Sequence, residues 1–285
     1  MDQFRFTSRD GTEIACYRWK ATARPKGVLQ ISHGMGEHAL RYAPVAEFYN
    51  ANGFHVVAND HRGHGKSVKS KEGLGDFGAG GWNALIADMT TLSRKARAEF
   101  SGLPLIVLGH SMGSFALQQY LLDHSGAIAG AVLSGSAAAD RLPVDPERDA
   151  DLSAINRAFE PARTPFDWLS RDEKEVDKYV ADPLCGFGVN KAGMISMAAA
   201  MARTIDPKAL ALIRKDLPIY VFAGDKDPVN ANLAGLKIVA QRYRDAGIAD
   251  VTEKYYPGGR HEMFNETNRD EVMRDLLAWM NGVVG

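Results

Sequence analysis

The chain has 285 residues, of which 45% are hydrophobic and 24% are charged, and its formal net charge is −1. This composition is typical of a folded globular protein with one large domain, and it argues against nucleic acid as a partner because basic residues are not in excess. The N-terminal residues lack a secretion signal and no apolar run approaches the roughly 18 residues of a membrane span, so we expect a cytoplasmic protein. Cys16 and Cys185 lie far apart without metal-ligand spacing, which predicts free thiols and no metal site.

Short apolar runs alternate with helical patterns along the first half of the chain. The predicted strands here are 4–8, 12–19, 28–32, 55–58 and 105–108, the first two joined by a turn at Asp10 and Gly11. The predicted helices are 41–52, which Gly53 ends, and 82–100, where apolar side chains recur with the period of a helix.

The second half repeats this alternation except in one long segment. Strands are predicted at 130–134, 217–223 and 251–256, and helices at 229–246 and 271–279. Residues 137–206 contain several prolines and no convincing strand, with helical patterns at 150–159, 171–180 and 190–203. We therefore predict an α/β fold with a mostly parallel sheet covered by helices on both faces. Residues 1–136 and 207–285 are expected to form this core domain, and residues 137–206 a helical cap inserted between two strands.

A candidate nucleophile stands between a predicted strand and a predicted helix. The apolar run 105–108 leads into residues 109–113, which have the pattern G-x-S-x-G centred on Ser111, and helical spacing follows. This arrangement is the nucleophile elbow, in which a sharp turn exposes the serine hydroxyl. We expect the two glycines to be required because the turn has no room for a Cβ and because glycine tolerates unusual backbone angles.

A serine hydroxyl needs a base to accept its proton and an acidic group to orient that base. The carboxyl ends of parallel strands meet at one edge of a sheet, so the partners should follow later strands. Asp225 and Asp227 follow the strand 217–223, and His261 follows the strand 251–256. Asp227 lies further beyond the strand end and is favoured as the orienting group, which leaves Asp225 for a turn or a helix N-cap. His110, next to the serine, is expected to point elsewhere.

Acyl transfer also needs hydrogen-bond donors for the developing oxyanion. The backbone N–H of Met112, directly after the serine, is one candidate. Met35 is the other, because it lies between two glycines in the loop after the strand 28–32, where its N–H is free to point into the site.

With these motifs in place, the chain resembles the α/β-hydrolase superfamily, and within it the monoacylglycerol lipase and lysophospholipase-like branch that is grouped with serine aminopeptidases. The resemblance rests on five motifs in order, which are residues 33–38 with Arg41 and Tyr42, 60–67, 109–113, 224–229 and 259–262. It implies that Ser111 is the nucleophile, His261 the base and Asp227 its partner. It also implies that Met35 and Met112 take the oxyanion positions, that residues 137–206 form the cap, and that no cofactor is needed.

The predicted function is hydrolysis of a monoacylglycerol, a lysophospholipid or a small acyl ester through an acyl-enzyme. An apolar helical stretch of the insert carries flexible methionines that suit an acyl chain, although such a stretch can also pack the insert onto the core. The candidate pocket residues are Met194, Met197, Met201 and Phe187, with Phe166 and Trp168 as further candidates. Transient contact of the insert with a lipid surface is compatible with this function.

Two other functions stay open. An aminopeptidase that releases proline would need acidic groups in the cap to hold the substrate ammonium. The acidic residues at 172–177 alternate with basic ones, which is typical of a solvated helix face. A ligand-binding receptor with a slow triad would show tight binding with negligible turnover.

Overall fold

A single mixed sheet forms the centre of the computed structural model, which describes residues 1–142, 145 and 147–285. Residues 143, 144 and 146 fall within the predicted insert and lie outside the described residues. The strands are β1 (Asp2–Thr7), β2 (Glu13–Trp19), β3 (Gly27–Ser32), β4 (Phe54–Asn59), β5 (Leu105–His110), β6 (Gly130–Ser134), β7 (Ile219–Gly224) and β8 (Val251–Tyr256). Their order in the sheet is β1-β2-β4-β3-β5-β6-β7-β8. β2 is antiparallel to both its neighbours, and the six strands β3 to β8 run parallel to one another. The predicted α/β fold with a mostly parallel sheet is therefore confirmed.

Helices cover both faces of this sheet. They are α1 (Ala43–Ala51), α2 (Gly81–Glu99), α3 (Met112–His124), α4 (Glu173–Ala181), α5 (Lys191–Met201), α6 (Pro207–Leu210), α7 (Ala234–Asp245) and α8 (Arg269–Val284). Short 3-10 segments include η1 (Ala39–Tyr42), η6 (Ser153–Phe159), η7 (Asp167–Leu169), η8 (Ala202–Ile205) and η9 (Met263–Asn265). None of the helices in the described ranges combines the length and apolar character that crossing a bilayer requires.

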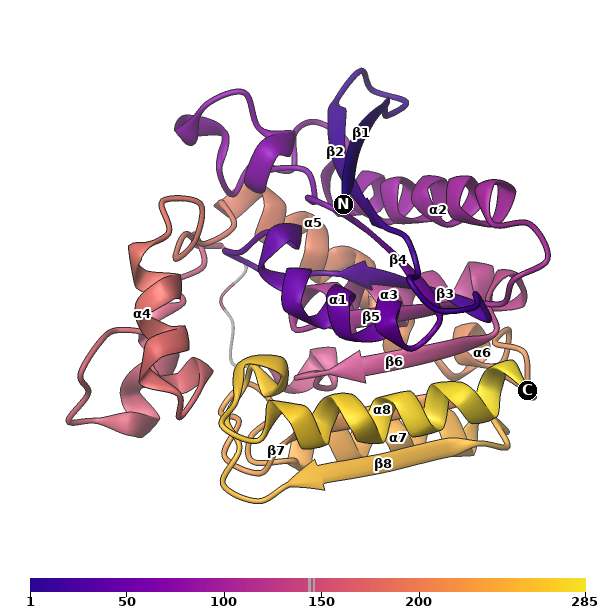
Figure 1. Cartoon of the computed structure of the whole chain (residues 1–285). Helices are drawn as coiled ribbons and strands as arrows, with labels where there is room; N and C mark the ends of the chain where they lie inside the picture. The colour runs from indigo at the N-terminus through magenta and orange to yellow at the C-terminus, as the bar shows by residue number, and fades with distance from the viewer. Residues whose placement is uncertain (143–144, 146) are drawn as a thin grey trace.

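The two faces of the sheet build two separate hydrophobic cores. Side chains of the strands alternate between faces, so Val28 joins one core and Leu29 the other. The first core contains the apolar faces of α2, α3, α5 and α7, and the second contains those of α1 and α8. In Figure 1, α1 and α8 lie on the side of the sheet nearer the viewer. Burial on both faces explains why β5, β6 and β7 are nearly continuous apolar runs, whereas the half-buried β8 also carries polar side chains.

The segment between β6 and β7 holds α4, α5 and α6, and no strand is found among its described residues. Figure 1 shows α4 standing apart from the sheet, at the edge toward which β6 and β8 point. In contrast, α5 packs into the core beside α2, where the Ser196 hydroxyl accepts a hydrogen bond from Trp82 N at 3.1 Å. The predicted helix at 150–159 is instead the 3-10 segment η6. The boundaries predicted for the insert stay a prediction.

The predicted helix at 229–246 begins five residues later than expected, at Ala234. Ala231, Asn232 and Leu233 have positive φ angles of 51°, 53° and 77°, which an α-helix does not allow. The cause is local, since the side chain of Asn230 accepts a hydrogen bond from Leu233 N at 2.6 Å. Polar side chains of this kind compete with the helix for backbone donors.

Candidate active site

Ser111 occupies a sharp turn between β5 and α3, with φ 51° and ψ −122°. Such a backbone conformation costs about 1–3 kcal/mol and persists only where its surroundings enforce it. Ser111 N donates to Ser134 O at 2.9 Å, which fixes the turn against β6. A Cβ at Gly109 would overlap the carbonyl of Gly113, and a Cβ at Gly113 would overlap the carbonyl of Ser32. The expected lack of room is confirmed, but the expected unusual angles of the glycines are wrong because Ser111 itself carries them.

His261 and Asp227 form a buried pair at the same edge of the sheet. Nδ1 of His261 lies 3.0 Å from Oδ2 of Asp227, and both side chains are almost completely buried. The carboxylate also accepts hydrogen bonds from Asn230 Nδ2 at 3.0 Å and Val229 N at 2.9 Å. Because a carboxylate can only accept, it holds the proton of the neutral ring on Nδ1 and leaves Nε2 as the basic atom.

The pKa of His261 reflects two opposed effects. Burial by itself lowers the pKa, but the charge of Asp227 and its hydrogen bond outweigh burial and raise the pKa above 6.5. Asp225, the alternative orienting residue, has a different role in the structure. Its Oδ1 accepts a hydrogen bond from Gly258 N at 2.8 Å, so it joins the loops after β7 and β8. The structure thus brings Asp227 to the imidazole and leaves Asp225 in a turn.

Short contacts connect His261 with the surroundings of Ser111. A Cβ at Gly135, next to the residue that accepts the Ser111 amide, would lie 2.9 Å from Cε1 of His261. Nε2 of His261 is buried and has no hydrogen-bond partner in the described part of the chain, so it makes no bond to the Ser111 hydroxyl. Bonds between a nucleophile and its base are often long in enzymes without substrate.

The amides of Met35 and Met112 both border Ser111. Met112 is the first residue of α3, and the first amides of a helix have no acceptor within the helix. Met35 follows Gly34, where a Cβ would lie 3.2 Å from Cβ of Ser111. Across the described residues, neither Met35 N nor Met112 N donates a hydrogen bond. Both amides are therefore without an acceptor in the described part of the chain, and their role as oxyanion donors stays a prediction.

His110 does not point away from the site, contrary to expectation. As the last residue of β5 its side chain follows the alternation of that strand, and its ring centroid lies 4.7 Å from that of His261. Its Nδ1 lies 3.2 Å from the Ser134 hydroxyl. Burial, together with the charge on His261, lowers the pKa of His110 to about 4. We expect His110 to stay neutral and to pack against the base.

A buried ionic network joins the loop after β3 to the loop after β8. The Arg41 guanidinium binds Glu37 at 2.7 Å and both carboxylate oxygens of Glu262 at 2.6 and 2.7 Å. Burial alone would raise the pKa of Glu262, but the paired Arg41 lowers it to about 2. Glu37 further accepts hydrogen bonds from Gly34 N at 2.6 Å and the Tyr42 hydroxyl at 2.9 Å. The sequence motifs contained these residues but did not indicate that they pair.

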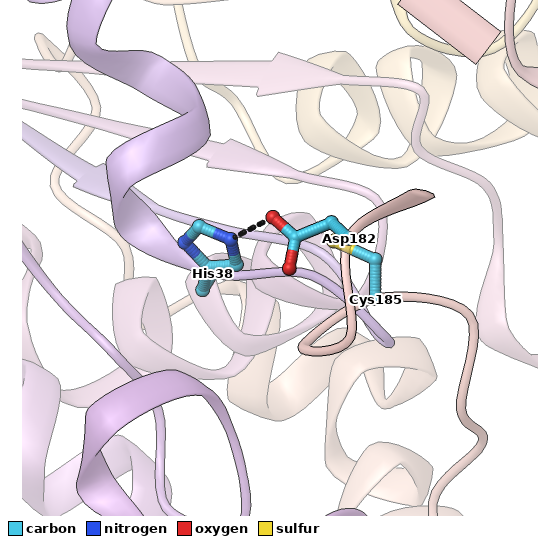
Figure 2. Close-up of side chains that lie close together, drawn as sticks. All are labelled: His38, Asp182 and Cys185. Carbon is cyan, nitrogen blue, oxygen red and sulfur yellow. Dashed lines mark hydrogen bonds and ion pairs between the residues drawn. The ribbon is translucent and has the colours of Figure 1, made fainter. Parts of the chain in front are cut away.

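A contact between the loop after β3 and the segment after α4 contains three groups that resemble metal ligands. Figure 2 shows Nε2 of His38 facing the Asp182 carboxylate, 2.9 Å away, with Cys185 beside it. The three ligand atoms lie within 4.8 Å of one another, one fewer than the four of a closed zinc site. Burial raises the pKa of Cys185, which keeps the thiol protonated. The hydrogen bond between His38 and Asp182 ties the loop after β3 to the segment after α4.

The residues proposed for the acyl pocket fall into two places. Met194, Met197 and Met201 are buried in the core that α2 and α3 share with α5. Phe187 lies in the loop before α5, its ring centroid is 4.9 Å from that of His64, and its carbonyl contacts Gly36. Phe187 thus borders the loop of Met35, whereas the methionines also serve packing. Their role as an acyl pocket stays a prediction.

This fold, with its serine elbow, defines an α/β-hydrolase. The family model described as "Serine aminopeptidase, S33" matches residues 23–268, and the chain belongs to this family. It is 33% identical over 278 residues to the monoacylglycerol lipase of Mycolicibacterium smegmatis, covering 96% of this chain and 95% of that protein. It is 28% identical over 281 residues to human monoglyceride lipase, covering 95% and 88%.

Solved structures agree with these relatives. A thermostable carboxyl esterase from Bacillus coagulans, solved in complex with glycerol, superposes with a TM-score of 0.89 at 30% identity, covering 100% of this chain and 99% of that one. Taken together, the relatives and the fold make the protein a carboxylic-ester hydrolase.

Proposed function

We propose that the protein hydrolyses monoacylglycerols through an acyl-enzyme on Ser111. The observation that carries this proposal is the buried pair of His261 and Asp227, 3.0 Å apart, at the sheet edge that also holds the strained Ser111. The choice of substrate rests on the relatives, whose names describe monoacylglycerol and monoglyceride lipases. Lysophospholipids and small acyl esters are the neighbouring substrate classes.

The proposed reaction begins when Nε2 of His261 takes the hydroxyl proton as Ser111 attacks the ester carbonyl. The amides of Met35 and Met112 donate to the oxyanion that forms. His261 then returns the proton to the leaving alcohol, and an ester bond joins the acyl group to Ser111. Water attacks this ester with the same histidine as base, which releases the fatty acid and restores the serine.

We further propose that residues 137–206 act as a cap that selects the substrate. Described residues of this segment reach both sides of the candidate site. The Tyr179 hydroxyl donates to Gly36 O at 2.8 Å, beside Met35, and Trp168 packs on His261 with ring centroids 4.8 Å apart. A substrate bound at Ser111 would therefore contact the segment on the oxyanion side and on the base side.

The aminopeptidase alternative is weaker because the acidic residues at 172–177 already have basic partners. Asp172 pairs with Arg269, and Asp177 lies 2.5 Å from Arg163. Glu175 binds Arg269 at 3.1 Å as well. Carboxylates that are neutralised in this way are poor ligands for the ammonium group of a peptide.

A substrate panel at equal acyl length tests the proposal. We expect the highest kcat/KM for a monoacylglycerol, lower values for the matching lysophospholipid and aryl ester, and negligible release of a naphthylamine from aminoacyl-naphthylamides. Faster turnover of the naphthylamides than of the esters would contradict the lipase proposal and favour the aminopeptidase alternative. Stoichiometric retention of a ligand without turnover of any ester would favour the receptor.

The pH profile reports the pairing of His261 with Asp227. Since the base works when neutral, kcat/KM should fall as the pH drops through the pKa of His261, with a midpoint above 6.5. The Asp227→Asn variant removes the charge that raises this pKa, so its midpoint should move to lower pH and its kcat should fall by about 10⁴-fold. Asp225→Asn is the matched control, and it should keep the wild-type midpoint. A midpoint that Asp227→Asn leaves in place would contradict the pairing.

A further inference from the structure

We propose that the indole N–H of Trp168 donates a hydrogen bond to the alcohol part of the substrate. Trp168 would thereby select esters whose alcohol carries a second hydroxyl group close to the ester oxygen. This inference rests on the proposed function and adds a specificity-determining residue to it.

The indole of Trp168 lies against the imidazole of His261. Trp168 lies in η7 and is 3% exposed, and its ring centroid is 4.8 Å from that of His261 with an angle of 43° between the planes. The imidazole that is the candidate base therefore has an indole as its direct neighbour.

The backbone holds the two rings together. His261 N donates to Trp168 O at 3.4 Å, and Glu262 N donates to Leu169 O at 2.7 Å. The buried carboxylate of Glu266 strengthens this connection by accepting hydrogen bonds from backbone amides of both segments. The indole is thus fixed to the loop that carries His261, and it keeps its place beside the base if other parts of the segment move.

Each of these two rings has a buried nitrogen atom without a hydrogen-bond partner among the described residues. In the described part of the chain, Nε1 of Trp168 and Nε2 of His261 are both buried and have no hydrogen-bond partner. A buried polar atom left in this state costs about 1–3 kcal/mol, so such atoms are rare and need an explanation. Here two of them belong to rings that touch. For His261 the explanation is the reaction itself. The N–H of the neighbouring indole also lacks an acceptor, and we infer that the substrate supplies it.

The reaction identifies that acceptor. Nε2 of His261 gives its proton to the oxygen of the leaving alcohol, so the alcohol must lie against the imidazole when the ester bond breaks. A hydroxyl on the adjacent carbon of that alcohol offers lone pairs within reach of a donor beside the imidazole. Trp168 belongs to an apolar cluster against which Leu152, Phe166 and Val229 pack. In such surroundings a hydrogen bond is stronger than in water.

The test compares two esters with the same acyl chain, glyceryl monooctanoate and ethyl octanoate. Trp168→Phe keeps an aromatic ring and removes the N–H. We expect kcat/KM for the glyceryl ester to fall about fivefold to tenfold and that for the ethyl ester to stay within about twofold. The midpoint of the pH profile should not move, because the variant leaves the pairing of His261 with Asp227 intact.

Phe166→Leu is the matched control, since it loosens the packing of the same cluster without removing a donor. It should change both esters by the same factor. Equal losses for both esters in Trp168→Phe, or no loss for either, would overturn the proposed role of the indole. If that variant does not fold, benzothienylalanine in place of Trp168 provides the same shape without the N–H. A wild-type protein that hydrolyses neither ester would instead overturn the proposed function.

Discussion

Replacing Ser111 by alanine is expected to reduce kcat for monoacylglycerol hydrolysis by at least about 10⁴-fold. The reason is that no other hydroxyl occupies the strained turn between β5 and α3, beside the free amides of Met35 and Met112. The measurement is the release of fatty acid from a monoacylglycerol under saturating substrate. Binding should survive, because the substitution removes one oxygen atom and leaves the surrounding loops in place.

Two controls make this result decisive. Ser101→Ala changes an exposed serine and should retain full activity. This control excludes a loss of activity that comes from the expression and purification of a variant. The unfolding midpoint of Ser111→Ala should match that of the wild type, because the alanine keeps the Cβ. Residual activity of Ser111→Ala within tenfold of the wild type would mean that another group attacks the ester.

Replacing Arg41 by methionine is expected to lower the free energy of unfolding by about 3–5 kcal/mol. Arg41 is the cation between Glu37 and Glu262, and its loss leaves two buried carboxylates without a counter-charge. The measurement is urea unfolding at neutral pH. The deficit should shrink as the pH falls, because without Arg41 burial raises the pKa of Glu262 and the protonated group carries no charge.

Arg203→Met provides the matched control for that experiment. Arg203 also binds a carboxylate, that of Asp123 at 2.8 Å, but the two side chains are 46% and 44% exposed. An exposed pair contributes less than about 1 kcal/mol, so this variant should unfold nearly as the wild type does. Similar losses of unfolding free energy in the two variants would show that burial of the Arg41 network does not determine how much it stabilises the fold.

The positions of the candidate catalytic residues could be predicted because they depend on local patterns. Most strands of the parallel part of the sheet are short apolar runs, and Ser111, Asp227 and His261 stand in the loops or turns that follow β5, β7 and β8. The topology then brings the ends of these strands to one edge. The glycine at position 109 could be predicted in the same way, from the steric needs of a sharp turn.

Contacts between distant segments could not be predicted from the sequence. Arg41 and Glu262 are 221 positions apart, and nothing in the spacing of either motif indicates that they meet. Trp168 stands in a segment without a clear helical or strand period, so its place beside His261 depends on backbone hydrogen bonds that only the folded chain contains. The late start of α7 had a local cause. The side chain of Asn230 accepts a hydrogen bond from Leu233 N and so competes with the helix that the apolar pattern predicts through this point.

Covalent trapping tests the central claim, that His261 and Asp227 activate Ser111, most directly. The protein is treated with an alkyl fluorophosphonate, and the modified residue is identified by intact mass and peptide mapping. We predict one phosphonyl group per chain, attached to Ser111, with a rate that follows the titration of His261 and is lost in His261→Ala. Labelling of a different residue, or labelling of Ser111 at the same rate in His261→Ala, would contradict the account.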